Sequence, residues 1–336
     1  MALGLIVMAL LVAPALVACS SAEVAERDVG TRDPRPHPAP TGSQEPLEWR
    51  QLAPVPTPRT EVAAAAAAGS IYVIAGFAEG AGTVSTVEVY DIAGDSWSTG
   101  PSLPVAVNHG MAASVKGEVY AVGGYLGPGL SNPTSRAFVL RDGEWQELPR
   151  MPGARGAGGA ARARGKLFVV GGVTPNGLAT KTFVYNPETD KWRTRRGMPT
   201  DRQHLGVASD GRRIYAVAGR TGGLASNLDV AERFNLARRR WRTLPDVPTR
   251  RGGLAAAGTT NGFIVAAGGE ANEGTFDEVE AFNVERGRWR SLPRMPTARH
   301  GLGVVAVGTV IYVLAGGPEP GLTFSNANES LDLSTL

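Results

Sequence analysis

The run Ile71-Tyr-Val-Ile-Ala-Gly76 decides the fold, because near copies of it return along the chain with a period of about 48 residues. Each copy joins β-branched or aromatic residues to a small residue and a glycine. This pattern predicts a short buried strand that ends where another backbone comes close. The small-Gly pairs assigned from this spacing are Ala75-Gly76, Gly123-Gly124, Gly171-Gly172, Ala218-Gly219, Ala267-Gly268 and Ala315-Gly316.

Two unrelated markers keep the same spacing, which indicates a repeat architecture. The six tryptophans follow one another at steps of 48, 48, 47, 49 and 48 residues: Trp49, Trp97, Trp145, Trp192, Trp241 and Trp289. A proline stands between each tryptophan and the next buried run: Pro56, Pro104, Pro152, Pro199, Pro248 and Pro296. An aromatic residue precedes five of the tryptophans by seven positions, with turn-forming residues between the two, so each such pair predicts a hairpin.

Each unit is therefore predicted to hold four strands, a to d. Strand a is the segment before the small-Gly run and contains mostly alanine and glycine, as in 62–68 and 156–161. Six consecutive alanines would favour a helix by propensity alone. The same place in other units holds paired glycines, which favours a strand that is crowded by its neighbours around a common axis.

These markers resemble the kelch repeat, whose members form β-propellers with one four-stranded blade for each repeat. The resemblance covers about residues 48–336 and implies an all-β, six-bladed propeller. Trp49 precedes the first complete unit, and no tryptophan follows the last one. We therefore expect 49–52 to serve as strand d of the sixth blade, paired with a strand c at 329–333, so that the ring is closed without free edges.

The N-terminal segment predicts an extracytoplasmic location. Residues 1–18 carry no charged side chain, are interrupted by Pro14 and are interpreted as a signal peptide. The sequence Leu16-Val-Ala-Cys19 resembles the lipobox of bacterial lipoproteins, which implies lipidation of Cys19; an uncleaved anchor and plain secretion remain the alternatives. Residues 19–47 are rich in proline and are predicted to be a disordered tether, with 48–336 as the propeller.

Composition excludes several classes of protein. A single cysteine excludes a disulfide framework and a multi-cysteine metal site. A formal net charge of +3, from 34 basic and 31 acidic residues, gives no nucleic-acid footprint. We expect a monomer that contacts the membrane only through its lipid anchor.

The candidate site lies where the d-to-a and b-to-c connections emerge on one face. Five d-to-a connections carry arginine three residues after the proline, and a rim of guanidinium groups would suit an acidic ligand. The alternative is that each arginine packs its stem and bonds the carbonyls of its own loop. The candidate rim consists of Arg59, Arg155, Arg202, Arg251, Arg299, His109, His204, Arg220 and Glu270.

His109, His204 and His300 could hold a metal at the axis. His300 follows its proline by four residues and the other two follow theirs by five, so we expect the three not to converge and predict no metal and no cofactor. Known catalytic motifs are missing. The first hypothesis is therefore a lipid-anchored module that binds a protein or glycan. The resemblance also implies a sugar-acid (sialic acid-like) mutarotase as an alternative, and a structural envelope component is the second alternative.

Overall fold

A computed structural model describes residues 46–80 and 82–336. The predicted signal peptide, Cys19 and nearly all of the predicted tether lie outside the described residues. Within them, the structure holds no helix of the length and apolar character that a membrane span requires.

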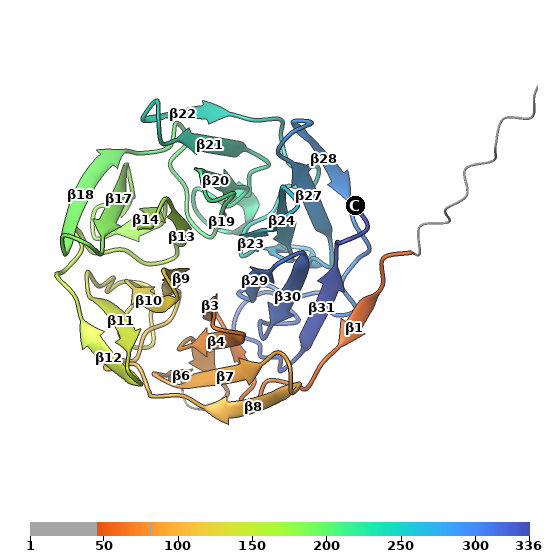
Figure 1. Cartoon of the computed structure of the whole chain (residues 1–336), viewed down its shortest axis with the longest axis horizontal. Coiled ribbons are helices and arrows are strands. Elements are labelled where there is room, and N and C mark those ends of the chain that lie inside the picture. The colour runs from red at the N-terminus through yellow and green to blue at the C-terminus, as the bar shows by residue number, and fades with distance from the viewer. Residues whose placement is uncertain (1–45, 81) are drawn as a thin grey trace, which may run out of the picture. The chain divides into compact units, whose positions relative to one another are not determined.

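Six four-stranded antiparallel sheets are arranged around an axis, and each is one blade of a β-propeller (Figure 1). In five of the sheets the strand order follows the chain outward from the axis, and in the sixth the outermost strand is β1. Blades 1 to 3 comprise β3(Ala63–Ala67), β4(Ser70–Ile74), β7(Val87–Asp91) and β8(Ser96–Thr99); β9(Met111–Val115), β10(Glu118–Val122), β11(Ala137–Arg141) and β12(Glu144–Glu147); and β13(Gly159–Ala163), β14(Lys166–Val170), β17(Lys181–Asn186) and β18(Lys191–Arg196). Blades 4 to 6 comprise β19(Gly206–Ser209), β20(Arg213–Val217), β21(Ala231–Asn235) and β22(Arg240–Thr243); β23(Ala255–Gly258), β24(Phe263–Ala267), β27(Val279–Asn283) and β28(Arg288–Ser291); and β29(Gly303–Val307), β30(Val310–Leu314), β31(Asn328–Asp332) and β1(Trp49–Gln51).

The ring closes as the sequence predicts. Strand β1 pairs antiparallel with β31, with Trp49 opposite Leu331 and Gln51 opposite Glu329. The first described strand of the chain is thus the outermost strand of the last blade (Figure 1). The fourth strand of blade 6 therefore comes from the opposite end of the propeller sequence.

Each tryptophan connects its blade to the preceding one, which explains why the spacing is so regular. The indole N–H donates to a backbone carbonyl about one repeat earlier in five blades, as in Trp97 to Ala53 at 2.8 Å. Trp49 donates to Pro293 at 2.9 Å and so makes the same contact across the closure. The full set of acceptors is Pro293, Ala53, Pro101, Pro149, Arg196 and Pro245.

Six apolar clusters fill the six spaces between neighbouring blades. The innermost strands approach one another so closely that side chains must be small. A Cβ at Gly159 would lie 2.3 Å from a methyl group of Val207, and a Cβ at Gly206 would lie 2.8 Å from the Cβ of Ala256. This crowding is why the alanine run at β3 forms a strand in spite of its helix propensity.

The fifth small-Gly pair lies one residue later than the sequence spacing assigns it. Both members of each pair have a left-handed backbone, and in blade 5 these are Gly268 and Gly269, with φ of 67° and 123°. Gly269 donates its N–H to Arg299 O, as Gly76 does to Val107 O in blade 1. Ala267 belongs to β24, so three pairs, not four, begin with alanine.

Short elements lie on the connections at one face. They are β2(Arg59–Thr60) with β5(Phe77–Ala78) and β6(Gly82–Thr83); β15(Val173–Thr174) with β16(Gly177–Leu178); β25(Glu270–Ala271) with β26(Gly274–Thr275); and the 3-10 helix η1(Leu224–Ser226). Strand β2 lies on a d-to-a connection, and the others lie on b-to-c connections. These connections surround the axial site.

Candidate functional site

One residue from each blade contributes to a ring of backbone hydrogen bonds around the axis. In five steps, the N–H of one ring residue donates to the carbonyl of the preceding one at 2.8–3.1 Å, and Val62 N closes the ring on Gly301 O at 3.2 Å. Every ring residue has a left-handed backbone, with φ between 50° and 70°. The ring residues are Glu61, His109, Ala157, His204, Gly253 and Gly301. Because only backbone atoms make the ring, the side chains at these positions are free to serve another purpose.

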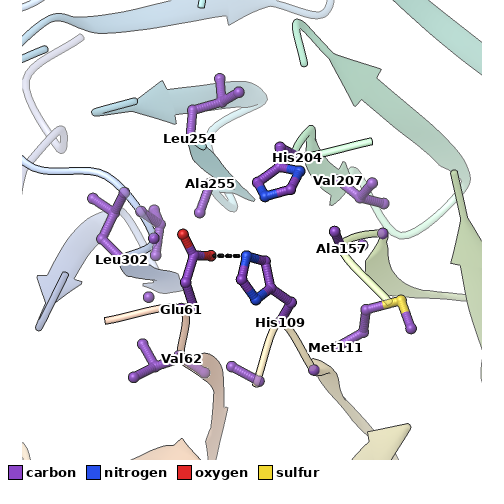
Figure 2. A pocket seen from close by; sticks show the side chains of 18 of the residues that line it. Glu61, Val62, His109, Met111, Ala157, His204, Val207, Leu254, Ala255 and Leu302 are labelled. Atoms are coloured by element: carbon purple, nitrogen blue, oxygen red, sulfur yellow. Dashed lines mark ion pairs between the residues drawn. The ribbon is translucent and has the colours of Figure 1, made fainter. Parts of the chain in front are cut away.

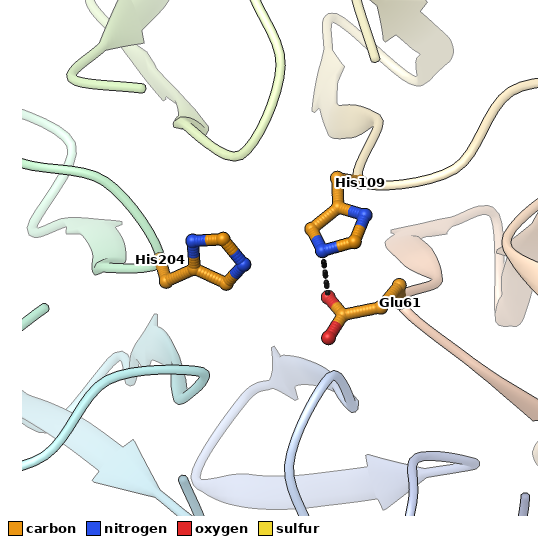
Figure 3. A group of neighbouring side chains, drawn as sticks. All are labelled: Glu61, His109 and His204. Atoms are coloured by element: carbon orange, nitrogen blue, oxygen red, sulfur yellow. Dashed lines mark ion pairs between the residues drawn. The ribbon is translucent and has the colours of Figure 1, made fainter. Parts of the chain in front are cut away.

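Three of the ring side chains are polar and gather at the axis (Figure 3). His109 Nε2 lies 3.1 Å from Glu61 Oε2. The imidazole rings of His109 and His204 meet edge to face, with centroids 4.9 Å apart. One donor atom from each of the three side chains lies within 4.8 Å of the other two. Both histidines are only 8% exposed.

Neighbouring amides fix the orientation and the protonated nitrogen of both histidines. His109 Nδ1 lies 2.8 Å from Asn108 Oδ1, while Asn108 Nδ2 donates to the carbonyl of Gly127 at 3.1 Å. A carbonyl only accepts, so the amide oxygen must face the histidine and Nδ1 must carry the proton. Gln203 Oε1 does the same for His204 Nδ1 at 3.0 Å, and its own amide nitrogen donates to a backbone carbonyl. In its neutral form each ring therefore has its lone pair on Nε2.

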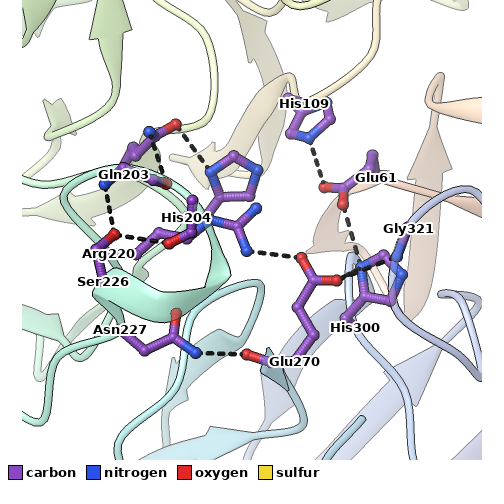
Figure 4. Close-up of polar contacts among 12 residues, drawn as sticks. Glu61, His109, Gln203, His204, Arg220, Ser226, Asn227, Glu270, His300 and Gly321 are labelled. Atoms are coloured by element: carbon purple, nitrogen blue, oxygen red, sulfur yellow. Dashed lines mark hydrogen bonds and ion pairs between the residues drawn. The ribbon is translucent and has the colours of Figure 1, made fainter. Parts of the chain in front are cut away.

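A second polar group extends from the same carboxylate (Figure 4). His300 Nδ1 lies 3.3 Å from Glu61 Oε1 and 3.6 Å from Glu270 Oε2. Arg220 donates to Glu270 Oε1 at 2.8 Å, and Gly321 N donates to Glu270 Oε2 at 3.3 Å. The b-to-c connections of blades 4, 5 and 6 are thus tied into one network around the axis.

The charges of the cluster follow from burial and proximity. Burial alone would raise the pKa of Glu61, but His109 and His300 beside it lower that pKa overall. Burial lowers the pKa of His109, although the Glu61 carboxylate opposes the effect. The pKa of His204 falls well below its ordinary value because the ring is buried and His109 is adjacent. Burial alone would lower the pKa of His300, but the hydrogen bond and charge of Glu61 raise it overall.

The Glu61, His109 and His204 side chains line a cavity of about 120 Å³ that continues along the axis between the innermost strands (Figure 2). The other lining side chains that Figure 2 labels are apolar: small at Ala157 and Ala255, and larger at Val62, Met111, Val207, Leu254 and Leu302. The polar groups of the cavity are therefore concentrated at the end where the backbone ring lies.

The five repeated arginines do not form the exposed rim that their spacing suggested, because all five are buried. Each is at most 1% exposed. Four of them pair with a buried glutamate on strand c at 2.5–2.7 Å and also donate to carbonyls at the end of strand b. The guanidinium groups therefore hydrogen-bond backbone carbonyls at or near the end of strand b. The four pairs are Arg59–Glu88, Arg202–Glu232, Arg251–Glu280 and Arg299–Glu329.

Blade 3 replaces the glutamate with an aromatic ring. Arg155 stacks over Phe183 with its guanidinium carbon 4.2 Å from the ring centroid, and it donates to Lys181 O at 2.8 Å. Burial without a paired carboxylate lowers the pKa of Arg155, an effect that Asp201 only partly opposes. In blade 2 the arginine position holds Val107, as the sequence shows.

The remaining predicted site residues do come together. His109 and His204 meet at the axis, and Arg220 and Glu270 pair beside them. The three histidines do not share one donor group among the described residues: His109 and His204 lie in one group, His300 lies with Glu270 in another, and Glu61 belongs to both. Sequence reasoning missed Glu61, although it follows its proline by five residues, as His109 and His204 follow theirs.

With the fold and the site described, the chain can be assigned to a class: a six-bladed β-propeller with a polar cluster on its axis. Residues 108–317 match the family described as KLHDC2/KLHL20/DRC7 Kelch-repeats domain, and residues 58–104 match the Kelch motif. The chain belongs to the kelch-repeat family.

Two known proteins illustrate the similarity. Kelch-like protein terF of Aspergillus terreus is 34% identical over 92 residues, which are 27% of this chain and 20% of that protein. The alignment therefore spans one fifth of that relative's length. A solved structure titled "Structure of YjhT" superposes with a TM-score of 0.72 at 15% identity, covering 82% of this chain and 95% of the other. This second likeness concerns the fold alone.

Proposed function

We propose that the chain is a binding module that engages a protein or glycan through the face formed by its d-to-a and b-to-c connections. The observation that carries this proposal is a pair of matching loop tips. Leu130 and Leu322 are 50% and 61% exposed, and each follows a Pro-Gly dipeptide on a b-to-c connection. Among the described residues, only Val307 joins them as an exposed large hydrophobic residue, and it lies at the a-to-b turn on the opposite face.

Both tips are held by the scaffold. Gly127, in the loop of Leu130, accepts hydrogen bonds from Thr83 Oγ1 at 2.6 Å and from Asn108 Nδ2 at 3.1 Å. Pro318, in the loop of Leu322, accepts one from Thr275 Oγ1 at 2.6 Å. Connections already ordered in the free protein lose less conformational entropy on binding, which favours a recognition role.

A matched set of substitutions tests this function. The purified chain is screened against a combinatorial peptide library and a glycan array that includes sialic acids. Leu130→Ser with Leu322→Ser should abolish saturable binding, while Val307→Ser on the opposite face should leave it intact. Equal loss in both variants, or binding that survives the double substitution, would reject the loop face as the binding surface.

The axial cluster favours a second candidate, a sugar-acid mutarotase. The partly exposed Glu61 and the buried His109 are in contact at the end of the axial cavity, an arrangement suited to proton transfer. Exchange spectroscopy with N-acetylneuraminic acid tests this candidate directly. Accelerated exchange between its anomers, lost in Glu61→Gln, would establish the enzyme; an unchanged exchange rate in saturating protein would eliminate it.

The lipobox resemblance at Cys19 underlies the proposed location on the outer side of a bacterial membrane. Metabolic labelling with an alkyne fatty acid, followed by fractionation, tests the anchor. Cys19→Ser should lose the label and leave the membrane fraction, whereas a labelled Cys19→Ser protein would contradict the proposal.

A further inference from the structure

The unprotonated nitrogens of two histidines face one carboxylate at the axis. Because Nδ1 of His109 donates its proton to Asn108, Nε2 of the neutral ring, 3.1 Å from Glu61 Oε2, carries a lone pair. Two lone pairs in contact repel each other unless a proton or another cation lies between them. A second proton on His109 would satisfy the contact with Glu61 but would provide nothing for His204. His204 Nε2 has no hydrogen-bond partner within 46–80 and 82–336, and His204 lines the axial cavity.

A single cation would satisfy all three groups, and we propose that Glu61, His109 and His204 bind one divalent first-row transition-metal ion, with Zn²⁺ as the reference occupant. Two imidazole nitrogens and one carboxylate oxygen form a known donor set for such ions. This inference concerns the axis and does not depend on the loop-face function proposed above.

The spacing of the donor atoms suits such an ion. Tetrahedral bonds of 2.0–2.2 Å place neighbouring ligand atoms about 3.4 Å apart, close to the 3.1 Å between His109 and Glu61. Since all three donor atoms lie within 4.8 Å of one another, His204 must approach by at most about 1.4 Å. A small rotation of its side chain supplies such a shift.

The surroundings resemble the outer sphere of a metal site. Histidine ligands usually donate their second nitrogen to an oxygen that fixes the ring, and here Asn108 and Gln203 accept from His109 and His204. The second oxygen of Glu61 is engaged by His300. Three protein donors leave a fourth position, which faces the axial cavity and is available to water or a small exogenous ligand.

Cobalt provides a spectroscopic test on the full chain carrying Cys19→Ser, a substitution that removes the only thiol. Titration with Co²⁺ should give visible d–d absorption that saturates at one ion per chain and disappears on addition of Zn²⁺. His109→Ala and His204→Ala should each weaken binding at least a hundred-fold. Alanine is compatible with this backbone, since Ala157 occupies the same ring position with φ of 53°. Asn108→Ala should weaken binding by ten- to a hundred-fold, as expected for a group that orients a ligand.

The control variant is His300→Asn, because His300, Glu61 and Glu270 form a second group of closely spaced donors. Because His300 contacts only the second oxygen of Glu61, this variant should retain the Co²⁺ spectrum and should weaken binding by no more than Asn108→Ala does. Circular dichroism of each variant checks the fold. The proposal is overturned if the parent chain binds no stoichiometric Co²⁺, if His204→Ala binds as tightly as the parent, or if His300→Asn alone loses the spectrum.

Discussion

Removing a buried arginine should destabilise blade 4 more than the same change destabilises blade 3. Arg202 donates to Glu232 at 2.5 Å and to the carbonyls of Ala218 and Ala216 at 2.7 and 2.9 Å. Arg202→Val leaves a carboxylate that is 1% exposed without its cation. Breaking such a pair costs about 3–5 kcal/mol of unfolding free energy.

Arg155→Val is the matched control, because no glutamate occupies the corresponding position of blade 3. The change removes one hydrogen bond to a carbonyl and the stacking on Phe183, together about 1–3 kcal/mol. Valine suits the position sterically, since Val107 occupies it in blade 2.

Urea unfolding followed by tryptophan fluorescence measures both variants, with circular dichroism to verify a single transition. The double variant Arg202→Val with Glu232→Leu removes both charges and should recover at least half of the loss. Equal losses for Arg202→Val and Arg155→Val, or a double variant no more stable than Arg202→Val, would refute the reasoning.

Three further predictions concern single positions. Gly172→Ala should lower the melting temperature by several degrees because a Cβ there lies 2.5 Å from a carbonyl oxygen, whereas Gly177→Ala meets nothing within 4 Å and should cost less; equal shifts would contradict this. Ala157→Gly relieves a left-handed backbone at φ of 53° and should raise unfolding free energy by about 0.5–1 kcal/mol, and a decrease in urea denaturation would contradict this. The hydrogen bond from Arg141 lowers the pKa of Glu118, so this pair stabilises the fold above the ordinary glutamate pKa and the stability is lost as pH falls through the lowered value. Glu118→Gln should therefore cost under about 1 kcal/mol at pH 7 and nothing in strong acid, and a pH-independent difference in thermal unfolding would contradict this.

The blades were predictable from sequence because the backbone of each blade requires a particular residue type at each marker position. The small-Gly pair must adopt positive φ where strand b ends, and the tryptophan must reach a carbonyl of the preceding blade, as Trp97 reaches Ala53. The same markers place β1 in blade 6. The one-residue error at Ala267 arose because both alanine and glycine occur in the first position of the pair. The run Ala267-Gly268-Gly269 therefore contains two candidate pairs.

The site was harder to predict because its backbone ring holds different residue types: glutamate, histidine, alanine and glycine. Glu61, His109 and Ala157 occupy equivalent positions, so no repeated residue type marks the place. Counting five residues from each proline would have brought Glu61 and His109 together. The sequence also contains a signal for the buried arginines. In blade 4, Glu232 stands two residues before the aromatic residue of strand c, and this glutamate pairs with Arg202.

The pairing of Trp49 with Leu331 joins residues 282 positions apart, and this gives the chain an unusual order of assembly. Translation proceeds from the N-terminus, so the earliest propeller segment to be made is the last to find its neighbour. Long-range pairing of this kind slows folding, because the entropy of loop closure is lost before the stabilising contacts form. A nascent chain that lacks β31 therefore cannot pair β1 and cannot close the ring. The ring closes only after β31 has been synthesised.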